Sequence, residues 1–297
     1  MSDPVIFTID IHPDGGTAPD GGWASTVHRV ETDAPTLYVT DLGASRGDGI
    51  FETFGVIDGH PQSVAAHLAR LANSASLLEL PAPNEEQWRE AIRIAAAAVP
   101  TEVQCGLKLV LTRGIEGTGS PTGWIVASEA GSVFAERIAG IRVVTLDRGY
   151  PSDIAQRAPW LLAGAKTLSY AVNMAAQREA RRRGADDAIF VSSDGFVMEA
   201  PTSTVIVRRG DTFVTPRADI GILPGTAQLA LFDFYRNAGF DTKKVLIPVS
   251  ELTDSDGIWL VSSVRLATPV THIDGAPLAV DHAMTERMNA ALLARDA

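Results

Sequence analysis

Short apolar runs of strand length alternate along this chain with amphipathic helical patterns, and turn residues separate them. Residues 51–57 read as an extended apolar run, after which Asp58-Gly59 gives a strong turn signal. A helical stripe of apolar residues at spacings of four and three comes next: Val64, Leu68, Leu71, Ala75 and Leu78. Because strand and helix periods keep alternating, the chain is predicted to have a mixed α/β (α+β) fold.

The first half continues with a second helix and two strands. The helix is predicted over residues 85–99, with Asn84 as its N-cap and carboxylates in the first turn, where they suit the positive end of the helix dipole. The strands are predicted over 107–112 and 124–128, on either side of a turn-rich loop.

The second half is predicted to open with a helix from Lys166 to about Arg183, ended by Gly184. Further elements follow: strands over 188–192, 196–200, 204–208, 245–247 and 258–262, and helices over 226–237 and 281–295. The stretch before this half mixes loop signals with one strand. We therefore expect domains at 1–135 and 161–297, joined by a linker region at 136–160.

Composition narrows the class of protein. The 297 residues carry a formal charge of −11, which opposes loose attachment to nucleic acid or anionic lipid. Cys105 is the single cysteine, so neither an intrachain disulfide nor a cysteine-based metal cluster can form. The N-terminus lacks a secretory pattern, and no run approaches the roughly 20 apolar residues that span a bilayer. We expect a cytoplasmic protein without metal, nucleic acid or membrane as partner.

One of the four lysines stands apart from the others. Lys243 and Lys244 are adjacent after a helix and turn, as solvated charges are, and Lys108 fits the polar face of an alternating strand. Lys166 follows apolar and then small residues, which would partly desolvate its amine and favour the nucleophilic form. Schiff-base catalysis needs such an amine. An ordinary surface lysine at a helix start would give the same pattern.

Four separated segments carry motifs that belong together: residues 46–53 (RGDGIFET), 67–71 (HLARL), Lys166, and 198–204 (MEAPTST). Their order and spacing resemble the class-IV aminotransferase family, which includes branched-chain and D-amino-acid aminotransferases and 4-amino-4-deoxychorismate lyases. With residues 221–226 (GILPGT) and 259–263 (WLVSS), the resemblance covers about residues 42–275.

The resemblance implies a two-domain fold type IV enzyme that binds pyridoxal 5′-phosphate (PLP) and forms a homodimer. Its small N-terminal domain would be α/β, and its larger C-terminal domain would be mixed and β-barrel-like, with helices. Lys166 would form the Schiff base with PLP and then move protons as the free amine. Glu199 would face the pyridine nitrogen and keep it protonated, and Arg70 would hold the phosphate.

The resemblance also places the amides of Thr226 and Ala227 at the phosphate, where a helix N-terminus favours an anion. Many relatives read Gly-Ile-Thr-Arg here, whereas this chain reads Gly225-Thr226-Ala227-Gln228, so the side-chain hydroxyl is displaced. Ser262 and Ser263 match hydroxyl positions near the cofactor in parts of the family.

Within the family, the motifs of this chain look most like those of the aminodeoxychorismate lyases. These enzymes convert 4-amino-4-deoxychorismate into 4-aminobenzoate and pyruvate for folate synthesis. Two alternatives stay open: an aminotransferase of D-amino-acid or branched-chain type, and a non-catalytic PLP-binding homologue. The small-molecule substrate of the lyase carries two carboxylates. Arginines are therefore expected near it, and the candidates are Arg46, Arg113 and Arg265.

Overall fold

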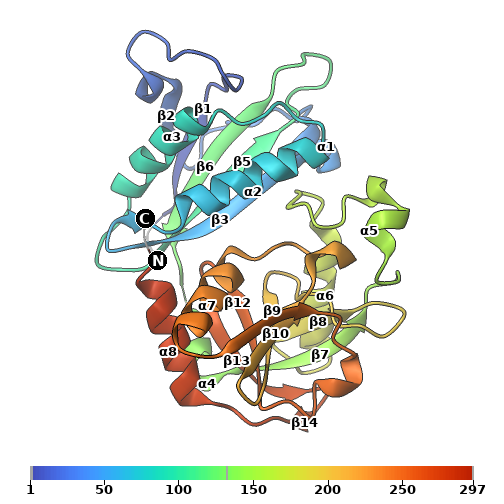
Figure 1. The fold of residues 1–297 in the computed structure, drawn as a ribbon. Coiled ribbons are helices and arrows are strands. Elements are labelled where there is room, and N and C mark those ends of the chain that lie inside the picture. The colour runs from blue at the N-terminus through green and yellow to red at the C-terminus, as the bar shows by residue number, and fades with distance from the viewer. Residues whose placement is uncertain (1–2, 132, 296–297) are drawn as a thin grey trace. The chain divides into compact units, whose positions relative to one another are not determined.

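The structure is a computed structural model that describes residues 3–131 and 133–295, and its contacts divide these residues into two compact units (Figure 1). The first unit contains residues 3–131 together with 165–170. The second contains 133–164 and 171–295. The chain thus leaves the first unit near the boundary expected at residue 135. The expected linker, 136–160, contributes strand and helix to the second unit, and the domain limits themselves stay a prediction.

The first unit is built on a six-stranded sheet in the order β2-β1-β6-β5-β3-β4. The strands are β1 (Val5–Ile9), β2 (Val27–Val30), β3 (Gly49–Ile57), β4 (His60–Pro61), β5 (Cys105–Thr112) and β6 (Thr122–Glu129). Helices α1 (Leu42–Arg46), α2 (Val64–Leu77) and α3 (Glu85–Ala97) complete the unit, and α2 and α3 pack on the sheet. The predicted cap is confirmed, because Asn84 Oδ1 accepts a hydrogen bond from the Gln87 amide at 3.0 Å.

The core of this unit lies between the sheet and these two helices. Its members include Phe54, Leu71, Trp88 and Leu107, which are fully buried. Burying each such side chain contributes on the order of 1.5–3 kcal/mol, so the stripe of α2 holds that helix against β3.

The second unit contains a sheet in the order β11-β10-β9-β12-β13-β7-β8, with β14 paired to β13. The strands are β7 (Ile141–Asp147), β8 (Asp187–Val191), β9 (Thr204–Arg209), β10 (Thr212–Pro216), β11 (Asp241–Val245), β12 (Gly257–Ser262), β13 (Leu266–Ile273) and β14 (Ala276–Pro277). The helices are α4 (Val133–Ala139), α5 (Ile154–Arg157), α6 (Ala171–Arg182), α7 (Thr226–Asn237) and α8 (His282–Leu293).

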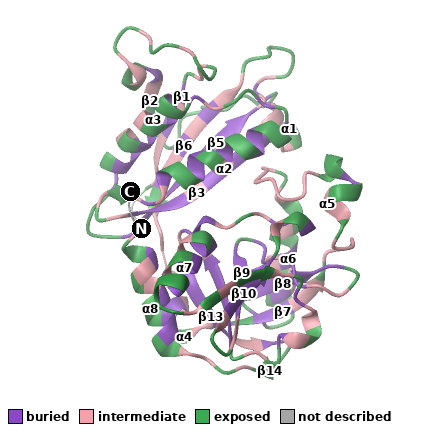
Figure 2. Cartoon of the chain, in the orientation of Figure 1, coloured by how far each residue is buried: buried purple, intermediate pink, exposed green. Residues whose placement is uncertain are grey.

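The central strands β9, β12 and β13 of this second sheet are buried along most of their length and are largely purple in Figure 2, whereas β11 and β14 are mostly exposed. Along β12, Ile258 and Leu260 enter one apolar cluster, whereas Trp259 and Val261 enter another with residues of α7 and α8. The first cluster draws residues from β7, β8, β9, β10, β12 and β13, so these strands share one apolar core. No helix in the described part of the chain is both long and apolar enough to cross a bilayer.

The structure corrects three sequence expectations. Helix α6 begins at Ala171 and not at Lys166, because the backbone of residues 166–168 is hydrogen-bonded to β3 instead of to a helical turn. The strand expected over 196–200 is a loop with isolated bridges. Six strands were also not predicted from the sequence, namely β1, β2, β4, β10, β13 and β14. Strands β10 and β13 each contain a proline, which ordinarily disfavours a strand.

Candidate active site

The backbone of Lys166 is held on two sides within the first unit. Its carbonyl accepts a hydrogen bond from the Phe51 amide at 3.0 Å, and Leu168 donates to the Gly49 carbonyl at 2.8 Å. On the other side, the Lys166 amide donates to Ser74 Oγ of α2 at 3.1 Å. The lysine therefore extends from a short segment that is hydrogen-bonded to β3 and α2, and not from a helix.

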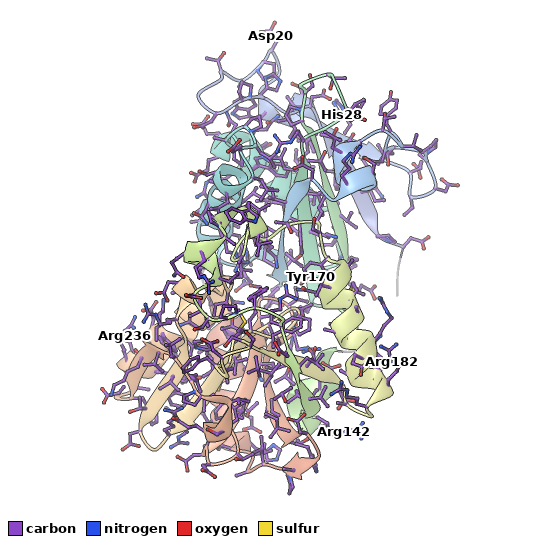
Figure 3. All side chains as sticks on the ribbon, turned by 90° about the vertical axis from the view of Figure 1, so that its right-hand side faces the viewer. Asp20, His28, Arg142, Tyr170, Arg182 and Arg236 are labelled. Atoms are coloured by element: carbon purple, nitrogen blue, oxygen red, sulfur yellow. The ribbon has the colours of Figure 1, made fainter. Side chains whose placement is uncertain are left out.

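The amine of Lys166 lies over an aromatic ring. Its Nζ is 4.5 Å from the centroid of the Phe51 ring, and the residue is half-buried. Tyr170, at the end of the same segment and labelled in Figure 3, meets the Phe51 ring edge-on at 5.4 Å between centroids. The two rings limit the positions open to a long, flexible side chain.

A buried ionic network lies on the other face of β3. Glu52 of β3 is fully buried and accepts hydrogen bonds of 2.7 Å from Nε and Nη2 of Arg70, while His67 Nδ1 lies 2.7 Å from Glu52 Oε2. Burial alone would raise the pKa of the Glu52 carboxyl. The positive charge of Arg70 and the hydrogen bonds with Arg70 and His67 outweigh burial and lower the pKa from 4.5 to about 2.

This network orients Arg70. A bidentate contact with a carboxylate fixes the plane of the guanidinium group, and the remaining nitrogen, Nη1, then points away from Glu52. A phosphate suits a guanidinium that is held in this way. On α2, His67, Arg70 and Ser74 are three and four positions apart, so one face of the helix carries the network and the contact to Lys166.

The second unit contributes a polar cluster at the start of α7. Thr226 Oγ1 and Ser263 Oγ are hydrogen-bonded at 2.9 Å, and both residues are buried. The N-cap, Gly225, has no side chain that could cap the first helical amides. A Cβ at Gly225 would lie 2.3 Å from Thr204 Oγ1, so the loop can approach β9 this closely only with glycine there.

Glu199 belongs to the same cluster. Its Oε2 accepts a hydrogen bond from the Leu223 amide at 3.1 Å, which ties it to the loop that leads into α7. Nearby, Ser203 Oγ and Gln228 Nε2 are buried and lack a hydrogen-bond partner among the described residues. Such groups are costly unless a polar ligand satisfies them, so the cluster fits a phosphorylated cofactor.

Ala227 and Ser262 complete the predicted cofactor residues. Ala227 is buried in the first turn of α7, where amides point out of the helix end. Ser262 Oγ accepts a hydrogen bond from the Arg265 amide at 3.3 Å and so closes its own turn. The structure thus brings Glu199, Thr226 and Ser263 together in one unit, and Lys166 and Arg70 in the other.

The three candidate substrate arginines differ in their surroundings. Arg113 pairs with Asp48 at 2.6 Å and donates to the Leu78 and Glu79 carbonyls. Arg265 pairs with the buried Asp187 at 2.7 Å and with Glu136 at 3.1 Å. Arg46 is exposed and has no ion pair or side-chain hydrogen bond within the part of the chain that is described.

These partners bear on the expectation that Arg113 and Arg265 bind the carboxylates of the substrate. The guanidinium groups of Arg113 and Arg265 are already neutralised by protein carboxylates, so their contacts favour a structural role over substrate binding. For Arg46 the substrate-binding role stays a prediction.

Sequence reasoning missed the partners of Arg70. Glu52 and His67 lie inside two recognised segments, but their contact joins positions 15 residues apart. A signal was present, since a charged residue within the apolar run of β3 has to be paired once the run is buried.

Comparison with known proteins agrees with this description. The sequence pattern of the amino-transferase class IV family matches residues 49–273. A bifunctional aminodeoxychorismate lyase / D-amino acid transaminase of Mycobacterium tuberculosis (strain ATCC 25618 / H37Rv) is 46% identical over 254 residues, which cover 82% of this chain and 88% of that protein.

Two solved structures extend the likeness over nearly the whole chain. A fold IV-transaminase from Curtobacterium pusillum is 49% identical, with a TM-score of 0.92 and coverage of 99% of this chain and 100% of that one. The PLP-bound form of a hypothetical aminotransferase from Mycobacterium tuberculosis is 41% identical, with a TM-score of 0.88 and coverage of 97% and 98%.

The fold and the two groups of residues define a PLP-dependent enzyme of fold type IV. The chain belongs to the class IV aminotransferase family, and PLP is its cofactor. When bound, PLP supplies an electron sink for the carbon next to the substrate's nitrogen.

The Glu52 network generates a prediction for cofactor affinity. Replacing Glu52 by Gln should weaken PLP binding by about tenfold or more, because a charge-assisted contact that orients Arg70 is lost. Titration of the apo-enzyme with PLP, followed by fluorescence, measures this. Glu90→Gln, which removes the exposed pair with Arg93 in the same unit, is the matched control. Unchanged PLP affinity in a folded Glu52→Gln protein would contradict the role given to Glu52.

The same network predicts how stability depends on pH. Because the pKa of Glu52 is lowered in the folded protein, its carboxylate stabilises the fold fully above pH 4.5, and this contribution is lost as the pH falls toward 2. Urea unfolding of wild type and Glu52→Gln at several pH values checks this. The difference between the two should be largest near neutral pH and shrink over that range.

Proposed function

We propose that this enzyme is an aminodeoxychorismate lyase that converts 4-amino-4-deoxychorismate into 4-aminobenzoate and pyruvate. The observation that carries the proposal is the fixed position of Lys166, whose backbone is held by Phe51 and Ser74 while its amine stays close to one ring. A relative that is 46% identical bears the name of a lyase and supports the choice of substrate.

The proposed roles follow from the two groups of residues. Lys166 binds the cofactor covalently and, once released, moves protons as the free amine. Arg70, Thr226, Ala227 and Ser263 bind the phosphate, with Ser262 shaping the turn beside it. Glu199, fixed by the Leu223 amide, holds the proton on the pyridine nitrogen.

The reaction needs one base and little else from the protein. Lys166 takes the proton from the ring carbon that carries the amine, and the bond between the ring and the enolpyruvyl oxygen breaks. The ring becomes aromatic as 4-aminobenzoate, and the enol takes up a proton and becomes pyruvate. Formation of the aromatic ring drives the elimination, so no second catalytic carboxylate is required.

Transamination of D-amino acids is the second candidate activity. The same lysine would then move the proton from the substrate carbon to the cofactor. The bifunctional name of the Mycobacterium tuberculosis relative and the transaminase from Curtobacterium pusillum both support this activity.

The substrate is tested by a side-by-side assay. Release of 4-aminobenzoate and pyruvate from 4-amino-4-deoxychorismate is compared with amino transfer from D-alanine and from branched-chain L-amino acids. Activity with the amino acids but not with 4-amino-4-deoxychorismate would contradict the proposal that the enzyme is a lyase. Full PLP loading without turnover of any substrate would instead favour a non-catalytic PLP-binding homologue.

Covalent attachment at Lys166 gives a direct prediction. Reduction of the holoenzyme with borohydride should fix the cofactor on the peptide that contains Lys166, because this amine is held in place by its neighbours. Peptide mapping by mass spectrometry measures the site. A pyridoxyl adduct on Lys108, Lys243 or Lys244 would contradict the assignment of Lys166 as the lysine that binds PLP.

A variant of Glu199 tests the electron sink. Glu199→Ala should keep PLP bound but lose turnover by about 100-fold, because the pyridine nitrogen is no longer held protonated. PLP content and kcat are measured on the same sample, with the exposed Glu116→Ala as control. Near-normal kcat in Glu199→Ala would remove Glu199 from this role.

The family resemblance also leads us to expect a homodimeric, cytoplasmic enzyme of folate-precursor synthesis. Sedimentation of the holoenzyme tests the oligomeric state, and a monomer at micromolar concentration would contradict it.

A further inference from the structure

A hollow lies on the first unit between α3 and the turn that leads into α2. Its volume is about 360 Å³, which is within the range of sites that hold small molecules. Its lining comes from the turn at Gly59 and His60, from the start of α2 and from one face of α3. The hollow shares no residue with the Glu52 network or with the segment that holds Lys166, so it is separate from the candidate active site.

The floor of the hollow is apolar. Ile92 and Ala96 lie one turn apart on α3, Val64 is the first residue of α2, and all three are buried. Helix α3 packs beside α2 and against β4 (Figure 1), so secondary structure holds the floor in place. An anion that is hydrophilic on all sides would lose water over this floor without gaining a partner, whereas a ring gains by covering it.

The rim of the hollow is basic. Arg89 and Arg93 lie four residues apart on α3 and border the hollow together with His60. No aspartate or glutamate lines the hollow within the part of the chain that the structure describes. Two guanidinium groups at an opening without carboxylates create a local positive potential, so the rim favours a negatively charged ligand.

Both arginines have a partner, but each keeps a nitrogen for another contact. Nε of Arg89 donates to Glu85 at 2.8 Å, and Nη2 of Arg89 lies 2.7 Å from the same carboxylate. Nε and Nη2 of Arg93 donate to Glu90 at 2.8 and 2.6 Å. Nη1 of each arginine has no hydrogen-bond partner among the described residues. Both ion pairs are exposed and therefore weak, so a ligand carboxylate can compete for the two guanidinium groups.

We propose that this hollow is a second binding site, and that it takes a small aromatic monocarboxylate. The ring would lie on Ile92 and Ala96, and the carboxylate would accept hydrogen bonds from Nη1 of Arg89 and of Arg93. A planar ring suits a floor that includes small side chains, and guanidinium groups also favour the faces of aromatic rings. The proposal goes beyond the proposed function and does not depend on which reaction the enzyme catalyses.

The test uses the holoenzyme with benzoate, the neutral benzamide and inorganic phosphate as probes. Calorimetry measures total binding, while the cofactor's absorbance reports separately on any probe bound near PLP. One variant, Arg89→Gln with Arg93→Gln, removes both charges of the rim. A second, Ala97→Phe, fills the hollow from an exposed position of α3. Arg182→Gln is the matched control, because it removes an exposed pair of the same spacing, with Glu179 on α6.

Wild type should bind benzoate about tenfold more tightly than benzamide, because two exposed charge contacts are made only with the carboxylate. Phosphate should not compete with benzoate. The double arginine variant should weaken benzoate binding by about the same factor and leave benzamide binding unchanged. Ala97→Phe should weaken the binding of both rings, since it covers the floor. Arg182→Gln should match wild type, and kcat should be unchanged in all three variants.

Four results would overturn the proposal. The first is no binding of benzoate by wild type, and the second is equal binding of benzoate and benzamide. The third is unchanged affinity for benzoate in the double arginine variant or in Ala97→Phe. The fourth is benzoate binding that calorimetry and the cofactor's absorbance report in equal amounts, because the ligand would then lie near PLP. Competition by phosphate would contradict the apolar part of the proposal and indicate a site for any anion.

Discussion

The buried carboxylate of Glu52 sits at the centre of the first unit. A charged group with no exposed surface is stable in a protein only if its oxygens are hydrogen-bonded and its charge is paired, and Arg70 and His67 provide both. Removing either partner would leave an uncompensated charge in the core. This requirement fixes α2 against β3, and α2 in turn supplies Ser74, which holds the backbone of Lys166. The position of the reactive amine therefore depends on an ion pair that does not touch it.

In the second unit, the polar cluster at the start of α7 is built around two neutral hydroxyl groups and not around an ion pair. At the start of α7 a phosphate would meet helix amides and the hydroxyls of Thr226 and Ser263, whose mutual hydrogen bond orients both. Where many relatives read Gly-Ile-Thr-Arg, this chain reads Gly225-Thr226-Ala227-Gln228, and its Thr226 hydroxyl is hydrogen-bonded to Ser263. Glu199 accepts a hydrogen bond from the Leu223 amide of the same loop, so a shift of this loop would move the groups proposed to bind the phosphate and the pyridine ring together.

Much of this was predictable from local patterns. The apolar stripe of α2 and the Asn84 cap depend on residues within one helix, and spacing reveals them. The roles of Lys166 and Glu199 were predicted from motifs, not from periodicity, and they stay predictions. The start of α6 was misjudged because residues 166–168 are paired with β3, a contact between segments more than 100 residues apart in sequence. The partners of Arg70, Arg113 and Arg265 were missed for the same reason, since tertiary pairing leaves no local signature.

Strand β3 separates two kinds of position residue by residue. Glu52 and Phe54 on one face pack against α2, whereas on the other face the Phe51 ring lies beside the Lys166 amine and Thr53 pairs across the sheet with Lys108. Natural variation can therefore act on alternate residues of a single strand with different consequences. Exchange at the first pair endangers folding, while exchange at the second pair reshapes the surroundings of the reacting group within an intact scaffold. A library that randomises Thr53 and Lys108 together, with Glu52 and Phe54 kept, would sample new substrates at little risk to the fold.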